Sequence, residues 1–221
     1  MGLSVNKVFK FVQFVANKEH RGWVSPEEFN IAAEVAQLSL YSELEGLYSA
    51  TKKISADLRP FRRTEECGNG TLSGDTGDIP EVRIPIQAWI TGGETNEYSP
   101  VKIIEESEYP GIKTSSLIPS AASYPIMFLR IDTDTSQLPE IIVDPSTVSI
   151  TLHYLTTPTP PEWDYTTTSG RPVYDDSGST NFGFEDMSFM EISRRILGHV
   201  GINIKDELVT QYAASFNQRQ Q

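Results

Sequence analysis

The chain has 221 residues, enough for one or two domains with a hydrophobic core, and its formal net charge is −12. Residues 64–164 hold 4 basic and 16 acidic groups (net −12), against 9 and 7 in residues 1–63 (net +2) and 5 and 7 in residues 165–221 (net −2). Such an acidic segment repels the phosphate backbone of nucleic acids, which argues against tight nucleic-acid binding. An acidic surface past which DNA slides without binding remains an alternative.

Residues 1–63 are predicted to form an N-terminal helical region. Apolar residues at helical spacing predict a helix over residues 4–17 with apolar side chains on two sides. Ser25, Pro26 and Glu28 suit the N-cap, first and third positions of a second helix, which we expect to run to about Tyr48 and to form a hairpin with the first. Its expected core face is Phe29, Ala33, Ala36, Leu40, Leu44 and Leu47.

Residues 64–79, rich in Gly, Thr and Asp, are predicted to be a flexible loop. An antiparallel β-domain is then expected over residues 80–163, because the apolar period changes to two. Pro85 favours an edge strand or a bulge there. The predicted strands cover residues 82–90, 101–104, 125–131, 140–143 and 148–155.

Residues 164–186 are predicted to be an extended loop, and residues 187–221 to be C-terminal helices that pack on the N-terminal helices. Gly201 suits a helix end and Asn203 a cap of the last helix. The predicted fold class is α+β: an N-terminal helical hairpin and C-terminal helices flank a mainly antiparallel β-sheet or small β-sandwich.

Residue patterns typical of catalysis or metal binding are absent from the sequence. His20, His153 and His199 stand apart without a paired-ligand pattern, and no G-x-S-x-G nucleophile elbow occurs. Cys67, the single cysteine, follows two glutamates that disfavour its thiolate. It cannot form an internal disulfide, which indicates synthesis in a reducing compartment.

The glycines of residues 68–77 lack the Lys-Ser/Thr of a phosphate loop, and Asp132 and Asp134 lack the Gly and Glu of a calcium loop. We therefore expect no enzymatic activity, no catalytic residues, no metal and no cofactor. A carboxylate-based hydrolase is the enzyme alternative, but abundant acidic residues do not make a catalytic pair. The sequence contains no recognisable export signal and no apolar run of roughly 20 residues. We therefore expect neither export nor membrane insertion.

Arg59, Arg62 and Arg63 form a basic cluster around Phe61. The cluster is either a solvated patch or a contact with the acidic middle segment of an adjacent copy. The candidate subunit interface is Arg59, Phe61, Arg62, Arg63 and Trp163. On that hypothesis, Phe61→Ala or reversal of Arg62 and Arg63 weakens assembly and leaves the monomer folded.

Short motifs follow one another along most of the chain: NKEHRG (17–22), SPEEFN (25–30), AQ (36–37), LRPF (58–61), YPI (124–126), VDP (143–145), YLTTP (154–158), PEW (161–163) and ISRRILGHVGI (192–202). In this order they resemble tail ring and head-to-tail connector proteins of crAss-like and related short-tailed bacteriophages. The resemblance carries no catalytic signature.

The resemblance implies a virion structural protein, a portal–tail adaptor assembled in the host cytoplasm and located in the tail or neck. The expected partners are further copies in a ring, expected to be dodecameric, the portal protein and other tail ring proteins. Genomic DNA passes through the lumen during ejection without specific binding, and no membrane is involved. The alternative is a monomeric β-module that binds a carbohydrate or other small ligand through Trp89, Tyr154 and Trp163.

Overall fold

The chain folds into two compact units, of which each is described by itself. In the computed structural model the helical unit comprises Met1–Pro60 and Pro158–Gln221, and the β unit comprises Phe61–Thr157. The β unit is therefore inserted within the sequence of the helical unit. The residues that the structure describes are 2–18, 23–48, 56–67, 71–72, 82–91, 99–115, 120–122, 124–131 and 139–204.

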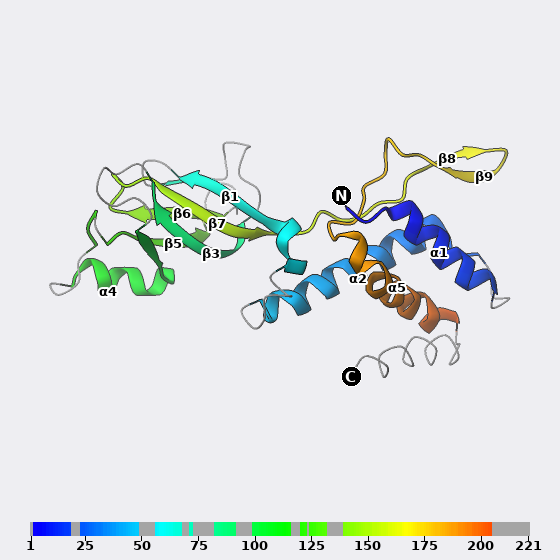
Figure 1. The fold of residues 1–221 in the computed structure, drawn as a ribbon, viewed down its shortest axis with the longest axis horizontal. Coiled ribbons are helices and arrows are strands. Elements are labelled where there is room, and N and C mark those ends of the chain that lie inside the picture. Colours follow the sequence, from blue (N-terminus) through cyan, green and yellow to red (C-terminus); the bar gives the residue numbers. More distant parts are fainter. Residues whose placement is uncertain are drawn as a thin grey trace. The chain divides into compact units, whose positions relative to one another are not determined.

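The helical unit is built around helices that come from both ends of the chain. Helix α5 packs on both α1 and α2, which confirms the predicted contact between C-terminal and N-terminal helices (Figure 1). Helix α5 runs through Gly201 and Asn203 to Ile204, so the predicted helix end at Gly201 and cap at Asn203 are wrong. The rest of the expected last helix lies outside the described residues, which end at residue 204. The elements of this unit are α1 (Val5–Lys18), α2 (Pro26–Gly46), β8 (Tyr165–Thr168), β9 (Arg171–Tyr174), the 3-10 turn η4 (Asp186–Ser188) and α5 (Phe189–Ile204).

Helix α2 begins where its capping residues predict. The Ser25 hydroxyl accepts from the Glu28 amide at 3.2 Å, and the Glu28 carboxylate accepts from the Ser25 amide at 3.1 Å. Phe29 meets Phe9 of α1 edge to face, with ring centroids 5.0 Å apart, so the two helices share a core. The predicted core face holds through Leu40 and then fails, because Leu47 is 47% exposed. The buried residues of α2 are Pro26, Phe29, Ala32, Ala33, Ala36, Gln37, Leu40 and Tyr41.

The β unit contains a seven-stranded sheet in the order β1-β7-β3-β4-β5-β6-β2. All its pairs are antiparallel except β4 with β5, which confirms the mainly antiparallel prediction. The strands are β1 (Arg62–Cys67), β2 (Thr71–Leu72), β3 (Val82–Ile90), β4 (Pro100–Ile103), β5 (Ile126–Ile131), β6 (Pro139–Asp144) and β7 (Ile150–Thr156). The shorter elements are η1 (Arg59–Phe61), which leads into the unit, η3 (Glu106–Glu108) and α4 (Tyr109–Lys113).

The core of the β unit follows the predicted alternation in β7. Ile150, Leu152 and Tyr154 are fully buried, as residues on one face of a strand should be. Strand β3 lies between β7 and β4, so Pro85 is not on an edge strand. Instead, register shifts on either side of Pro85 show the bulge that its missing N–H favours.

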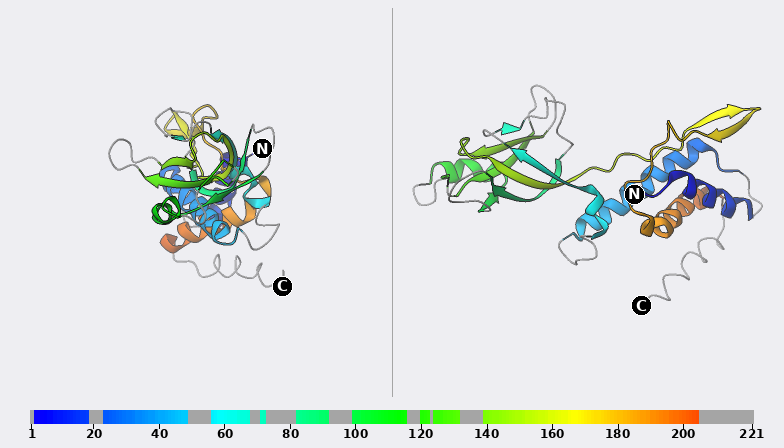
Figure 2. Two further views of the ribbon diagram at one scale, coloured as in Figure 1. Left: turned by 90° about the vertical axis from the view of Figure 1, so that its left-hand side faces the viewer. Right: turned by 45° about the horizontal axis from the view of Figure 1, so that its top comes forward.

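Two segments predicted as loops contain strands. Residues 64–67 belong to β1, which pairs along β7, and residues 71–72 form β2, which pairs with β6. The polar sequence of β1 gives no apolar pattern, because Arg62, Arg63, Thr64 and Glu66 are exposed. Within residues 164–186, β8 and β9 form a hairpin that stands out from the helices of its own unit (Figure 2). Ser169 (φ 53°) and Gly170 (φ 77°) make its two-residue turn, where Gly is favoured. Residues 73–79 of the first predicted loop lie outside the described residues.

Candidate functional site

Two side-chain amides of α2 hold the part of the chain that returns from the β unit. Asn30 accepts from the Trp163 amide at 2.9 Å and donates to the Trp163 carbonyl at 3.3 Å. Gln37 is fully buried, donates to the Thr159 carbonyl at 2.7 Å and accepts from the Gly183 amide at 2.9 Å. The side-chain oxygen and nitrogen of Asn30 and of Gln37 are all hydrogen-bonded to the backbone of other segments. Helix α2 therefore fixes the segments before and after the β8–β9 hairpin.

Trp163 anchors the base of the hairpin to α1. Its ring stacks on Phe9 with centroids 4.1 Å apart, and its indole nitrogen donates to Asn6 at 3.3 Å. Tyr165 and Tyr174, at the open end of the hairpin, each lie 5.8 Å from the same ring. Contacts in this aromatic cluster stabilise the β8–β9 hairpin against the helices, which a hairpin with four residues per strand needs.

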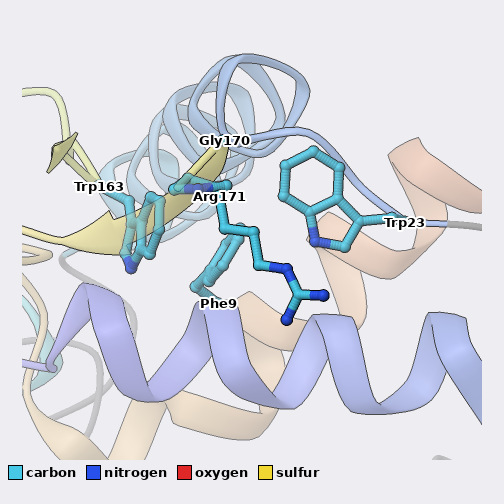
Figure 3. Close-up of a pocket in the computed structure, with 6 residues that line it drawn as sticks. Phe9, Trp23, Trp163, Gly170 and Arg171 are labelled. Carbon is cyan, nitrogen blue, oxygen red and sulfur yellow. The ribbon is translucent and has the colours of Figure 1, made fainter. Parts of the chain in front are cut away.

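A surface pocket of about 420 Å³ opens beside this cluster. Figure 3 shows the Arg171 side chain lying between Trp23 and Phe9. Trp23 is 54% exposed, so this wall of the pocket faces solvent. The lining residues are Phe9, Trp23, Trp163, Gly170, Arg171 and Pro172. Aromatic walls around one guanidinium suit a planar or anionic group from outside the chain.

The residues of the predicted interface do not share one environment. Arg59 is exposed and lies 3.4 Å from Glu185, a surface pair that contributes little to stability. Arg62 and Arg63 are exposed on β1, where Arg63 donates to the Arg62 carbonyl at 3.0 Å. Because Arg59 falls in the helical unit and the other two in the β unit, these three residues belong to different bodies.

Phe61 and Trp163 are buried in the chain itself, with 3% and 4% of their surface exposed. Their burial in the single chain therefore lends no support to a place for either ring in a subunit interface. Removing the Phe61 ring leaves a cavity in the protein's own core, so Phe61→Ala does not test assembly separately from folding. Trp163 is packed by Phe9, a residue distant in sequence, which local spacing cannot show.

Arg62 also faces the sheet surface around His153. His153 lies 2.9 Å from the Thr64 hydroxyl through Nδ1 and meets the Trp89 ring edge on at 5.3 Å. Partial burial lowers the pKa of His153 below its ordinary value, and the positive charge of Arg62 lowers it further. The imidazole is therefore held neutral near pH 7.

The aromatic residues of the small-ligand alternative do not form one surface. Tyr154 is fully buried in the β unit, whereas Trp89 is half-buried on the sheet. Trp163 belongs to the core of the helical unit. These environments follow from long-range packing, which the spacing of aromatics along the sequence does not reveal.

Sequence reasoning missed a candidate interaction surface, which consists of exposed apolar side chains. Of eleven large hydrophobic residues exposed in the described part of the chain, two, Ile84 and Tyr124, lie in the β unit. The other nine lie in the helical unit: Phe14, Trp23, Ile31, Val35, Leu38, Leu47, Val173, Met187 and Met190. The signal was present in α2, where residues 31, 35 and 38 repeat at helical spacing outside the predicted core face.

Within the described ranges, no group of three or more His, Cys, Asp or Glu side chains could hold a metal ion. His199 is exposed on α5, and Cys67 is the last residue of β1, paired with Ile150. Asp132, Asp134 and His20 lie outside the described residues. Among the helices that the structure describes, none is both long and apolar enough to cross a membrane. Comparison with known proteins finds no family model and no curated protein that matches this chain.

Proposed function

We propose that this protein is a virion structural protein, a subunit of an oligomeric ring in the head-to-tail connector or tail of a tailed bacteriophage. The observation that carries the proposal is the exposure of nine large apolar side chains on a helical unit with its own buried core. Neighbouring apolar side chains that are exposed together, as Ile31, Val35 and Leu38 are on α2, are typical of a surface that a partner covers. The order of the short motifs along the chain resembles that of phage ring and connector proteins, and from this resemblance we infer that the particle is a tailed bacteriophage.

The charge of the β unit fits a wall beside DNA. Residues 61–157 carry 6 basic and 14 acidic groups, a net charge of 6 − 14 = −8. In the proposed ring, this unit lines or surrounds the channel between portal and tail. An acidic wall repels the phosphate backbone, so genomic DNA passes during ejection without specific binding.

The proposed partners are further copies of this chain, in a ring that the resemblance implies is dodecameric, and the portal protein and other tail ring proteins. Arg62 and Arg63, exposed on β1, are proposed to contact an acidic surface of a neighbouring subunit. Assembly takes place in the host cytoplasm, and the finished protein resides in the tail or neck of the virion.

The test is the molar mass of the purified protein by light scattering, followed by negative-stain imaging alone and with purified portal protein. The proposal predicts closed rings of one size, formed spontaneously or on the portal. A strict monomer that also ignores the portal would overturn it and favour the small-ligand alternative.

Charge-reversed chains sharpen this test. Arg62→Glu with Arg63→Glu is expected to reduce the fraction of protein in rings or on portals several-fold, because like charges then face each other. The matched control reverses two exposed lysines elsewhere on the β unit, Lys102→Glu with Lys113→Glu. Equal loss in both double variants would count against a specific contact at the arginines.

A further inference from the structure

Helix α2 carries an apolar stripe on the side opposite its buried face. Ile31, Val35 and Leu38 are 67%, 43% and 38% exposed, and their spacing of four and three residues places them on one side of the helix. The core-facing side is occupied by residues such as Phe29 and Ala36. We call Ile31, Val35 and Leu38 the α2 stripe.

Acidic residues border the α2 stripe. Glu27 and Glu34 are exposed and lie seven residues apart, on the same side of the helix. Each is followed four residues later by a member of the stripe, Ile31 and Leu38 respectively, so carboxylates run along one edge of the apolar surface. A surface that covers the stripe therefore needs apolar side chains flanked by positive charge.

Helix α1 offers a surface of that composition. Phe14 is 64% exposed, and Lys7 and Lys10 are exposed at positions seven and four residues before it, on the same side of α1. Lys7 is held in place by Asp186 at 3.2 Å and by the Phe189 ring, whose centroid is 5.0 Å from its nitrogen. We call Lys7, Lys10 and Phe14 the α1 face.

The α1 face extends onto α5. The Phe11 and Phe189 rings lie 5.2 Å apart, which joins the outer side of α1 to the start of α5. Met190, next to Phe189, is 56% exposed and adds a flexible apolar side chain to this region. An aromatic and methionine surface beside lysines is complementary to an aliphatic stripe beside glutamates.

We propose that the α2 stripe of one copy docks on the α1 face of the next copy. This inference rests on the proposed ring and names the contact that repeats around it. Because different surfaces of each copy meet, the contact is heterologous and propagates head to tail, which gives a ring when the rotation closes.

The chain's own fold argues against an internal pairing of the two surfaces. Each lies opposite the buried side of its helix: α1 turns Val5, Val8 and Val12 into the core, and α2 turns Phe29 and Ala33 into it. Since both helices share that core, their outer sides point away from one another. A second copy is the partner of matching charge that the described residues supply.

The test reverses one charge on each surface. Lys10→Glu and Glu34→Lys are each expected to weaken self-association about tenfold or more, measured by sedimentation velocity over a concentration series, because like charges then face each other in the contact. The double variant Lys10→Glu/Glu34→Lys is expected to recover association close to the original. Lys102→Glu and Glu162→Lys, at exposed residues that belong to neither the α2 stripe nor the α1 face, are the matched controls.

Mixing the two single variants separates a contact between copies from one within a copy. In a mixed ring with a heterologous contact, two kinds of contact alternate. In one, the unchanged Glu34 of a Lys10→Glu chain meets the unchanged Lys10 of a Glu34→Lys chain. In the other, the introduced lysine at position 34 meets the introduced glutamate at position 10, so opposite charges meet in both. An equimolar mixture is therefore expected to associate more tightly than either variant alone. Rescue in the double variant without rescue in the mixture would overturn the proposal in favour of an internal contact.

The apolar component is tested with Ile31→Ser/Val35→Ser, which is expected to abolish self-association while the melting temperature of the monomer stays within a few degrees. A large loss of monomer stability would mean that another part of the same chain covers the α2 stripe, which overturns the proposal.

The outcomes also separate this inference from the proposed function. Rings that form equally well with all of these variants would overturn the α2–α1 contact and leave the ring intact. A wild-type chain that stays monomeric at every concentration would also overturn the contact, while its binding to the portal would still support the proposed function.

Discussion

The helical unit and the β unit expose very different surfaces. The helical unit holds nine of the eleven exposed large hydrophobic residues of the described chain, and its net charge is 12 − 16 = −4. The β unit holds two of them and has a net charge of −8. The helical unit therefore has the more apolar surface of the two, and the β unit has the more acidic one.

The two units also differ in how distant segments are joined. In the β unit, the ladder of β3, β7 and β1 carries the connection through backbone hydrogen bonds. In the helical unit, side chains make the connection: Asn30, Gln37 and Trp163 bind segments from opposite ends of the chain. The helical unit should therefore be sensitive to single substitutions at these positions.

The largest effect is expected from Trp163→Ala, which removes the ring that stacks on Phe9 and the hydrogen bond to Asn6. We expect the free energy of unfolding of the helical unit to fall by about 3 to 5 kcal/mol, as for other large-to-small core substitutions. Hydrogen exchange read by mass spectrometry should show faster exchange in α2 and unchanged exchange in β7. Equal loss of protection in both elements would mean that the units unfold as one.

A smaller loss is expected from Gln37→Leu. This change keeps the core apolar but leaves the Thr159 carbonyl and the Gly183 amide without their partner. The free energy of unfolding should fall by about 2 to 4 kcal/mol in urea titrations, the cost of two unsatisfied buried groups. Gln87→Leu, at an exposed position of β3, is the control and should change it by less than about 0.5 kcal/mol.

Ser25→Ala tests the start of α2 alone. The substitution removes the hydroxyl that accepts from the Glu28 amide, and we expect a loss of about 1 kcal/mol in thermal or urea unfolding. Ser42→Ala, exposed within the same helix, should be neutral or slightly stabilising because alanine is the better helix former. Equal destabilisation by both substitutions would contradict a capping role for Ser25.

The smallest effect concerns pH and lies in the β unit. The pKa of His153 is below its ordinary value of 6.5, so the unfolded chain binds the proton more readily. The stability that the neutral imidazole contributes is present above pH 6.5 and is lost as the pH falls through the pKa of the folded chain. His153→Gln should flatten this slope slightly in unfolding experiments between about pH 7 and pH 5.

Arg62→Gln should raise the pKa of His153 in an NMR titration, because Arg62 is the second cause of its lowering after partial burial. Arg63→Gln serves as the control, since its effect on this pKa should be the smaller of the two. Equal shifts in both variants would mean that general positive charge on β1, rather than Arg62, acts on the imidazole.

Local signals in the sequence predicted the helix starts and the clearest strands. Ser25, Pro26 and Glu28 act within one turn of α2, so their effect does not depend on the rest of the fold. The period of two in β7 likewise reports a half-buried strand directly. The α+β class and the packing of the C-terminal helix α5 on the N-terminal helices follow from such signals.

Contacts between distant segments were beyond that reasoning. Strand β1 is held by pairing with β7 and not by an apolar pattern, so its sequence alone predicts a loop. The turn signal Ser169-Gly170 was present, but the threonines of β8 lack an apolar face. The burial of Trp163 likewise comes from residues far along the chain, Phe9 and Asn6, which local spacing does not reveal.

The insertion of the β unit has a consequence for synthesis on the ribosome. Helices α1 and α2 emerge first, but Trp163 and α5, which cover them, emerge after the entire β unit. During that interval Asn30 and Gln37 lack their native partners, whereas the β unit can complete its sheet as soon as β7 has emerged. Nascent chains stalled within residues 61–157 should therefore expose the inner side of α2 and depend on chaperones to avoid aggregation.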